Sequence, residues 1–243
     1  MPIKGINLRG SKPLGQKVTE TLRSAIIYGE FKPGERLNES AIAAKLKTSK
    51  SPVREALRNL VSENLVESRN WKGTFVRDVT PKDIEEIYMV LSLIEGTITR
   101  LAAANMNGAR TKELKGLMRE IERAIKADNI KRNMMLSRKL HDFIVRTSGN
   151  TLLMKIHGHL RTQEVQFGRT AHSGAASVME VFQEHLSICE ALLEKDGGKA
   201  EMLMIDHIQR ARSRALKTLQ GNFNGGARLS EPRLTDDKES LAE

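Results

Sequence analysis

The first third of the chain consists of short apolar runs at helical spacing, separated by polar breaks. Apolar residues that recur every three to four positions predict a helix over about 16–29, a second over about 39–46, and a third after the break at 48–51. A Pro-Gly turn at 33–34 separates the first two helices. Pro52 is tolerated in the first turn of the third helix, where a residue has no intrahelical donor to lose.

The period of the pattern then changes. Two short strand-like runs, 65–69 and 74–77, flank a glycine-bearing tip that exposes Trp71 and Lys72. Three helices followed by a β-hairpin predict a winged helix-turn-helix module, which we bound at residues 14–78.

From residue 79 onward the sequence has long helical patterns and no strand signal. Six helices are expected, over about 82–105, 111–127, 130–147, 151–170, 176–195 and 197–220. The expected fold class is therefore mainly α, with a winged helix-turn-helix of three helices plus a β-hairpin followed by an all-helical antiparallel bundle at 79–220. A flexible arm is expected at 1–13 and a disordered tail at 221–243.

Composition changes this picture mainly through charge. The formal net charge is +10, and residues 1–78 hold 15 Lys and Arg against 8 Asp and Glu, a net +7, which leaves +3 for the rest of the chain. Positive charge focused on one module is expected where a protein meets a polyanion, so the winged module is expected to bind DNA. A generally basic, solvated surface is the alternative that charge alone leaves open.

Cysteine content and hydropathy narrow the class of protein. Cys189 is the only cysteine, which excludes an intramolecular disulfide and a Cys-rich zinc module. The N-terminal segment has no apolar signal region, and no run of about 18 apolar residues is present. We therefore expect a cytoplasmic protein without a membrane partner.

The third predicted helix has the pattern of a DNA-reading helix, with a polar, cationic start and an apolar back. The hydrophilic candidates at its start are Ser49, Lys50, Ser51, Arg54 and Arg58. Arg54 or Lys50 can donate to guanine, and the serines, together with Ser40 at the opening of the preceding helix, can bind phosphates. Lys72 and the backbone of Gly73 suit a wing that lies along or in the minor groove. A merely solvated helical face around Arg54 is the alternative.

These residues resemble a known DNA-binding module. The run Ser49-Lys50-Ser51-Pro52-Val53-Arg54-Glu55-Ala56-Leu57 and the run Lys72-Gly73-Thr74-Phe75-Val76 resemble the GntR family of bacterial repressors, and the resemblance covers residues 16–78. It implies a homodimer that binds a pseudo-palindromic double-stranded DNA operator. The chain departs from the family's usual Gly and Val at Lys47 and Thr48, and from its usual Arg at Lys50. A lysine keeps the charge but loses the bidentate fork, so Lys50 favours phosphate attraction over base readout.

The helical region resembles the FCD effector domain of the FadR-type branch of the same family. The motifs that carry the resemblance are Leu140-His141-Asp142-Phe143 with Ser148-Gly149-Asn150, Glu184-His185-Leu186, and Asp206-His207-Ile208. The resemblance implies a divalent metal held by His141, His185, His207 and an aspartate four residues before His141. Ser137 stands at that position, so three imidazoles would hold zinc or nickel and leave positions for water or a ligand carboxylate. Three hydrogen-bonded histidines without a metal are the alternative.

The same resemblance implies a small-molecule effector, an organic acid or similar metabolite. The family often has an arginine four residues before Glu95, where this chain has Leu91, and together with Ser137 this indicates an altered effector pocket. A bulkier or less acidic ligand therefore stays open. The expected function is a transcriptional regulator, usually a repressor of a metabolic operon, that is associated with the bacterial nucleoid when bound to DNA.

Two other functions were weighed against this one. A metal-dependent enzyme could use the three histidines to activate water, but Glu184 and Asp206 are expected to point away from the ligands they neighbour, which leaves no general base. We therefore expect no enzymatic activity. A non-specific architectural DNA binder would leave the histidines without a role.

The remaining candidates in the helical region favour structural roles. His157 and His159 lie two residues apart, so a helix cannot point both at one site, and surface or packing roles are expected. Cys189, one turn after His185, is expected to be a buried thiol of the core.

Overall fold

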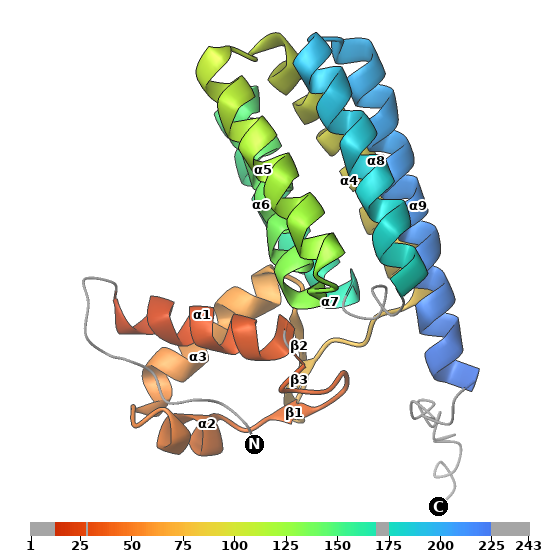
Figure 1. Ribbon diagram of the computed structural model, residues 1–243. Helices are drawn as coiled ribbons and strands as arrows, with labels where there is room; N and C mark the ends of the chain where they lie inside the picture. Colours follow the sequence, from red (N-terminus) through yellow and green to blue (C-terminus); the bar gives the residue numbers. More distant parts are fainter. Residues whose placement is uncertain (1–12, 28, 169–174, 225–243) are drawn as a thin grey trace, which may run out of the picture.

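The computed structural model describes residues 13–27, 29–168 and 175–224, and consists of a small α/β module followed by a helical bundle (Figure 1). The expected fold class is confirmed. The expected arm and tail lie outside the described residues, except that α9 continues as a helix to Asn224, beyond the expected end at residue 220.

The N-terminal module has three helices and three strands. These are α1 (Leu14–Ile27), β1 (Arg36–Leu37), α2 (Glu39–Lys45), α3 (Lys50–Ser62), β2 (Val66–Arg69) and β3 (Gly73–Val76). The strands form an antiparallel sheet in the order β1-β3-β2. Strand β1 was not expected from the sequence, because two residues are too short to display an alternating pattern and this strand exists through its pairing with β3.

Aliphatic side chains from all these elements form the core of the module. Val18 and Leu22 of α1, Ile42 of α2 and Leu60 of α3 are fully buried together with residues of the sheet. The Arg23 guanidinium donates two hydrogen bonds of 2.6 Å to the Glu63 carboxylate, which ties α1 to the end of α3. The outer face of α3 is thereby held in a fixed orientation.

Six helices form the second part of the structure. They are α4 (Pro81–Ala104), α5 (Gly108–Lys126), α6 (Ile130–Ser148), α7 (Thr151–Gly168), α8 (Ala175–Glu194) and α9 (Gly197–Asn224). Helix α4 contacts α6, α7, α8 and α9, and its contact with α9 is the most extensive in the bundle. Gly96 permits this close approach, because a Cβ at that position would lie 2.8 Å from Cγ1 of Ile205.

Helix α4 also connects the two parts of the molecule. Its start has a complete capping box, in which the Thr80 hydroxyl accepts from the Asp83 backbone N–H while the Asp83 carboxylate accepts from the Thr80 backbone. The same carboxylate pairs with Arg77, which directly follows β3. The end of the hairpin is therefore fastened to the first turn of α4.

Within the described part of the chain, α4 is the one helix that is long and apolar enough to cross a membrane by length and composition, with a hydropathy of 1.4. Of its most apolar window, 56% is buried inside the protein. Its contacts with four other helices account for that apolar composition as the core of a bundle.

Candidate DNA interface and candidate metal centre

Helix α3 buries its apolar stripe and exposes its polar start. Val53, Ala56, Leu57 and Leu60 are buried. The five hydrophilic candidates of this helix, Ser49, Lys50, Ser51, Arg54 and Arg58, are all exposed. Ser49 is the N-cap residue but its side chain makes no capping hydrogen bond, and the first turn has no acidic residue. The first backbone N–H groups of α3 are therefore well placed to bind an anion such as a phosphate.

Arg54 is paired with a neighbouring helix. Its Nε donates to Oε2 of Glu39 at the start of α2, at 2.7 Å, and both side chains are solvent-accessible. An exposed pair of this kind contributes about 0.2–1 kcal/mol, so DNA can replace it at small cost. The pair engages Nε, which leaves the two terminal nitrogens of Arg54 in position for a bidentate contact with a base.

The start of α2 differs in detail from the prediction. Ser40 does not open this helix, because Asn38 is the N-cap and its side chain accepts from the Ala41 backbone N–H at 3.1 Å. Ser40 is instead the second residue of α2, and it is exposed.

Lys47, between α2 and α3, explains the glycine that the GntR family favours at this position. Its φ is 52°, in the left-handed region where glycine has no steric cost. This chain makes the same turn with a lysine, whose side chain is exposed.

The wing projects its tip into solvent. Arg69 of β2 faces Gly73 of β3, and the Lys72 backbone N–H donates to the Arg69 carbonyl at 3.0 Å to close the turn. Gly73 has φ 102°, which a residue with a side chain rarely adopts. Lys72 and Gly73 are exposed, as a wing contact with DNA requires.

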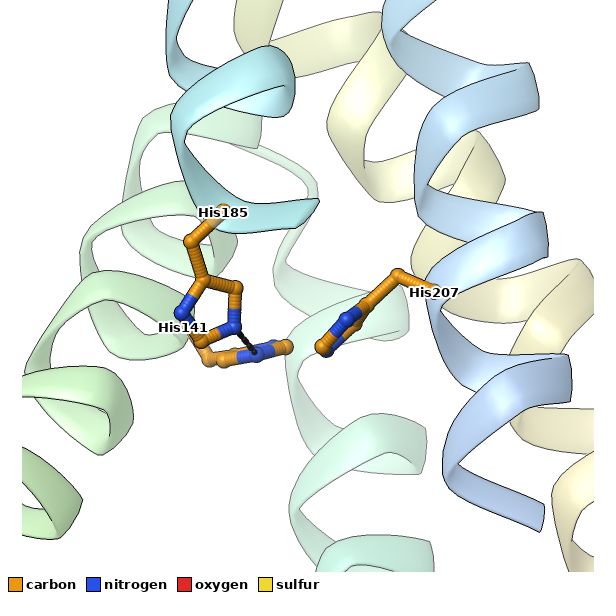
Figure 2. Close-up of side chains that lie close together, drawn as sticks. All are labelled: His141, His185 and His207. Atoms are coloured by element: carbon orange, nitrogen blue, oxygen red, sulfur yellow. Dashed lines mark hydrogen bonds between the residues drawn. The ribbon is translucent and has the colours of Figure 1, made fainter. Parts of the chain in front are cut away.

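Three histidines from three helices meet inside the bundle. His141 of α6, His185 of α8 and His207 of α9 are all buried, and Figure 2 shows their rings turned toward one another. One ring nitrogen from each lies within 4.8 Å of those of the other two. Nε2 of His141 and Nε2 of His185 are 3.3 Å apart.

Two carboxylates hold the outer nitrogens of this cluster. Nδ1 of His141 lies 2.8 Å from Oε2 of Glu95 on α4, and Nδ1 of His207 lies 2.7 Å from Oε2 of Glu184 on α8. Both contacts suit a neutral imidazole that donates from Nδ1 to the carboxylate and keeps a lone pair on Nε2.

Burial keeps two of these imidazoles neutral. It lowers the pKa of His185 well below its usual value, and the neighbouring His207 and His141 lower that pKa further. Burial also lowers the pKa of His207, although its hydrogen bond with Glu184 opposes this. A neutral imidazole is the protonation state that binds a metal.

One pair of ring nitrogens in the cluster has the separation that a tetrahedral metal ion requires. Two nitrogens that each lie about 2.0–2.1 Å from a tetrahedral zinc are separated by roughly 3.3 Å. The Nε2 atoms of His141 and His185 already have this separation. Each His–carboxylate pair is also the arrangement that orients metal-binding histidines.

A small cavity adjoins the cluster. Its volume is about 60 Å³, and it is lined by Tyr88, Ser137, His141, Arg161, Glu164, Val181, His207, Ile208, Ala211 and Arg214. Such a cavity accommodates about four water molecules or one end of a small ligand. Of the two predicted pocket residues, Ser137 lines it beside His141. Leu91 is instead fully buried in the apolar core, and it is absent from the cavity lining.

Two arginines bring positive charge to this cavity from α7 and α9. Arg161 lies 2.9 Å from Glu164 and 4.0 Å from Glu95, and Arg214 donates to both oxygens of Glu184 at 3.0 and 3.1 Å. Neither arginine was expected at this site from the sequence. Helical spacing contained a signal for Arg214, which lies two turns after His207 on the same face of α9.

Two expectations about neighbouring residues were wrong. His157 is not confined to a surface or packing role, because its Nε2 lies 3.1 Å from Oε1 of the buried Glu95. Burial alone would raise the pKa of Glu95, but its contacts with His141, His157 and Arg161 hold that pKa well below its usual value. Glu184 does not point away from the site either, because it is the carboxylate that binds His207.

The other residues behave as expected. His159 is exposed. Cys189 is buried in the core, where burial raises the pKa of its thiol to about 12.

Known proteins resemble this chain over most of its length. Residues 14–76 match the family described as bacterial regulatory proteins, gntR family, and residues 86–210 match the FCD domain. The chain is 28% identical over 188 residues to the HTH-type transcriptional regulator YdhC of Bacillus subtilis, which covers 76% of this chain and 84% of that protein. It is 29% identical over 195 residues to the probable D-xylose utilization operon transcriptional repressor of Paenarthrobacter nicotinovorans. That alignment covers 80% of this chain and 85% of the relative.

A solved structure supports the fold. Escherichia coli McbR/YncC has a TM-score of 0.72 to this structure at 22% identity, over 86% of this chain and 100% of that chain. The similarity therefore extends across both the winged module and the helical bundle. The matching families and relatives are transcriptional regulators, not enzymes.

Proposed function

Because the chain belongs to the GntR family of bacterial regulatory proteins and has a C-terminal FCD domain, we propose that it is a homodimeric, cytoplasmic repressor of a metabolic operon whose operator affinity is set by a small-molecule effector. The observation that carries the proposal is the exposed cationic start of α3 beside a wing, connected through α4 to a buried cluster of histidines. Within it we keep residues 14–78 as the DNA-binding domain and residues 79–220 as the effector domain.

The DNA-reading part of the proposal assigns separate roles to the exposed residues of α3. Arg54 reads a base in the major groove, because its side chain is exposed and its pair with Glu39 engages only Nε. Lys50 and Ser49 bind phosphate at the helix start, where backbone N–H groups and a positive charge coincide. Lys72 binds phosphate from the wing.

The metal part of the proposal places zinc or nickel among His141, His185 and His207. The lone pairs of three imidazoles suit these ions, and Glu95 and Glu184 keep two of the rings in the required tautomer. When bound, the metal supplies a Lewis acid that attracts a carboxylate oxygen. Ser137, in place of an anionic fourth ligand, leaves that position for water or for the effector.

The effector in this proposal is a small organic acid. Arg161 and Arg214 line the same cavity as His141 and His207, so they can pair with a carboxylate there. The volume of about 60 Å³ limits the buried part of the ligand to a few heavy atoms unless the helices separate. In this placement Arg161 of α7 and Arg214 of α9 supply the positive charge. The resembling family often supplies it with an arginine on α4, at the position where this chain has Leu91.

Helix α4 offers the route from effector to DNA. It carries Glu95, which contacts His141 and His157 in the cluster. Twelve residues earlier, about 18 Å along the helix, it carries Asp83, which pairs with Arg77 after the wing. An effector that binds one orientation of α4 more tightly therefore also changes the population of winged-module arrangements. The change in operator affinity equals the difference in effector affinity between those arrangements.

The homodimer has a candidate surface on the outer face of α4. Met89, Val90 and Leu93 are exposed there, with Met89 and Leu93 at 59% and 61%. Glu86 and Arg100 lie seven residues before and after Leu93, and both remain more than half exposed beside their partners in the chain. Two copies of α4 packed antiparallel about a twofold axis at Leu93 would place Glu86 of each near Arg100 of the other, so the surface is complementary to itself.

A binding selection tests the proposed function. A pool of random duplexes is selected on the full-length protein at moderate salt, and the enriched duplex is compared with a scrambled one by gel shift. We expect a pseudo-palindromic sequence with at least about 1,000-fold tighter binding than the scrambled duplex. Equal binding of both duplexes would contradict sequence-specific regulation.

A ligand screen then tests the effector. Organic acids are added to the complex of protein and selected duplex, in the presence of zinc, and release of the duplex is measured. We expect one class of small carboxylates to change the affinity by about 5- to 150-fold. A variant in which Arg161 is replaced by Gln should lose that response while it still binds the duplex.

A further inference from the structure

Trp71 at the tip of the wing is exposed beyond any other large hydrophobic side chain of the described residues. Its relative exposure is 104%, whereas Phe31, Phe143 and Tyr88 are at 3% or less. It is also the only tryptophan of a chain in which aromatic residues make up 4%. Folding of the module therefore gains no burial from this indole.

The backbone at this position is unfavourable as well. Trp71 has φ 61°, in the left-handed region that a bulky residue seldom occupies. The pairing of Arg69 with Gly73 on either side and the turn hydrogen bond from Lys72 to Arg69 fix this conformation. A strained backbone that presents an unburied aromatic ring is the combination expected where a side chain acts on something outside the domain.

Several cations lie in the same hairpin as Trp71. Lys72 follows it and is exposed, and the Arg69 guanidinium is held over the Phe75 ring at 4.4 Å from its centroid. Arg36 of β1 lies against the turn, because a Cβ on Gly73 would meet its Nε at 3.3 Å. The acidic partner near this group is Glu67, which pairs with Arg69 at 2.6 Å. An aromatic ring among cations suits a nucleic acid, whose bases stack and whose phosphates attract the cations.

From these observations we propose that Trp71 enters the DNA minor groove next to the major-groove segment read by α3, and inserts its ring as an apolar wedge at a base step. This inference rests on the proposed function. The minor groove is about 6 Å wide, which admits a flat indole edge-on. Strand β2 follows α3 directly, with the Leu65 N–H donating to the Leu60 carbonyl at 3.0 Å, so the wing and α3 approach DNA as one body. Apolar wedges of this kind unstack a base step and favour deformable sequences.

The chain supplies its own reporter for the test. Because Trp71 is the only tryptophan, the fluorescence of the full-length protein reports this side chain alone. Titration with the selected duplex should quench the emission and protect the indole from acrylamide. The scrambled duplex should do so more weakly.

Three variants separate a wedge from a charge effect. Trp71→Ala should weaken binding of the selected duplex by about 10- to 100-fold, with an unchanged dependence on salt, and Trp71→Phe should recover part of the loss. Lys72→Ala is the matched control, because loss of one phosphate contact at each half-site of a dimer lowers the salt slope by about two. Since both side chains are exposed, all three variants should keep the melting temperature of the parent protein.

The outcomes distinguish this inference from the function on which it rests. Tight binding of the selected duplex with unchanged tryptophan emission and unchanged affinity of Trp71→Ala would overturn the wedge alone, and would leave the indole to a protein or lipid partner. A loss in Trp71→Ala with a smaller salt slope would also overturn it, because the indole would then only position Lys72. Failure of the parent protein to prefer any duplex would overturn the proposed function as well.

Discussion

Removal of His185 tests whether the three-histidine cluster binds a metal. His185 contributes one of three ring nitrogens that lie within 4.8 Å of one another, and it is 3% exposed. At a free zinc concentration of about 1,000 times Kd, binding to the native state alone stabilises the protein by about 4 kcal/mol. For a chain of this size that corresponds to a rise in melting temperature of roughly 8–16 °C.

The variant His185→Ala should lose most of this rise. Removal of a partner that only orients a ligand weakens metal binding by about 10- to 100-fold, and loss of a ligand itself costs at least the upper value. At the same zinc concentration the stabilisation then falls to about 1.4 kcal/mol or less, a shift of at most roughly 3–6 °C. The assay is a thermal melt with zinc and with a chelator, for parent and variant.

The zinc-dependent shift is compared, rather than the melting temperature itself, because the cavity left by a buried imidazole lowers stability with or without metal. His159→Ala is the matched control, since His159 is an exposed histidine on α7. It should keep the full shift. An equal zinc shift in parent and His185→Ala, or no shift in the parent, would refute the metal site and leave the histidines as a hydrogen-bonded cluster.

Three other predictions concern the bundle. Leu93→Glu should convert the dimer to a monomer in analytical ultracentrifugation, because it places like charges opposite each other at the twofold axis. The control Met202→Glu on α9 should remain a dimer. If both variants are dimers, α4 does not form the interface. Gly96→Ala should destabilise the protein by about 1–3 kcal/mol, because its Cβ clashes with α9. Gly116→Ala should stabilise it by about 0.5–1 kcal/mol, because its Cβ meets nothing within 4 Å. Denaturant melts that reverse this order would contradict the close packing of α4 against α9. Burial raises the pKa of the Cys189 thiol to about 12, so a thiol reagent at pH 8 should label it only after unfolding; rapid labelling of the native protein would show that the bundle opens.

The elements predicted correctly are those that local chemistry determines. Helix α3 was predictable because its apolar residues, among them Val53, Leu57 and Leu60, form one stripe, and α4 because helical periodicity predicts a helix from about residue 82. Strand β1 could not be found in this way, because its two residues become a strand only when β3 lies alongside.

The functional cluster was predictable only in part, for a related reason. His141, His185 and His207 were identified from motifs that resemble a family, but the orienting role of the carboxylates Glu95 and Glu184 was not. Glu95 is 46 residues from His141 in the sequence. No local pattern indicates that α4 and α6 will pack so that Glu95 lies beside His141. Glu184 adjoins His185 but binds His207, so its partner depends on how α8 lies against α9.

The central claim is that the outer face of α3 reads DNA sequence, and Arg54→Ala tests it most directly. A lost bidentate contact costs about 1–3 kcal/mol at each half-site, so a dimer should lose about 2–6 kcal/mol of preference for the selected duplex over the scrambled one. Arg119→Ala removes the same charge from an exposed position on α5 and should keep the preference. Loss of preference in Arg54→Ala, with the dimer intact, is the predicted result, and an unchanged preference in that variant would contradict the assignment of α3 as the recognition helix.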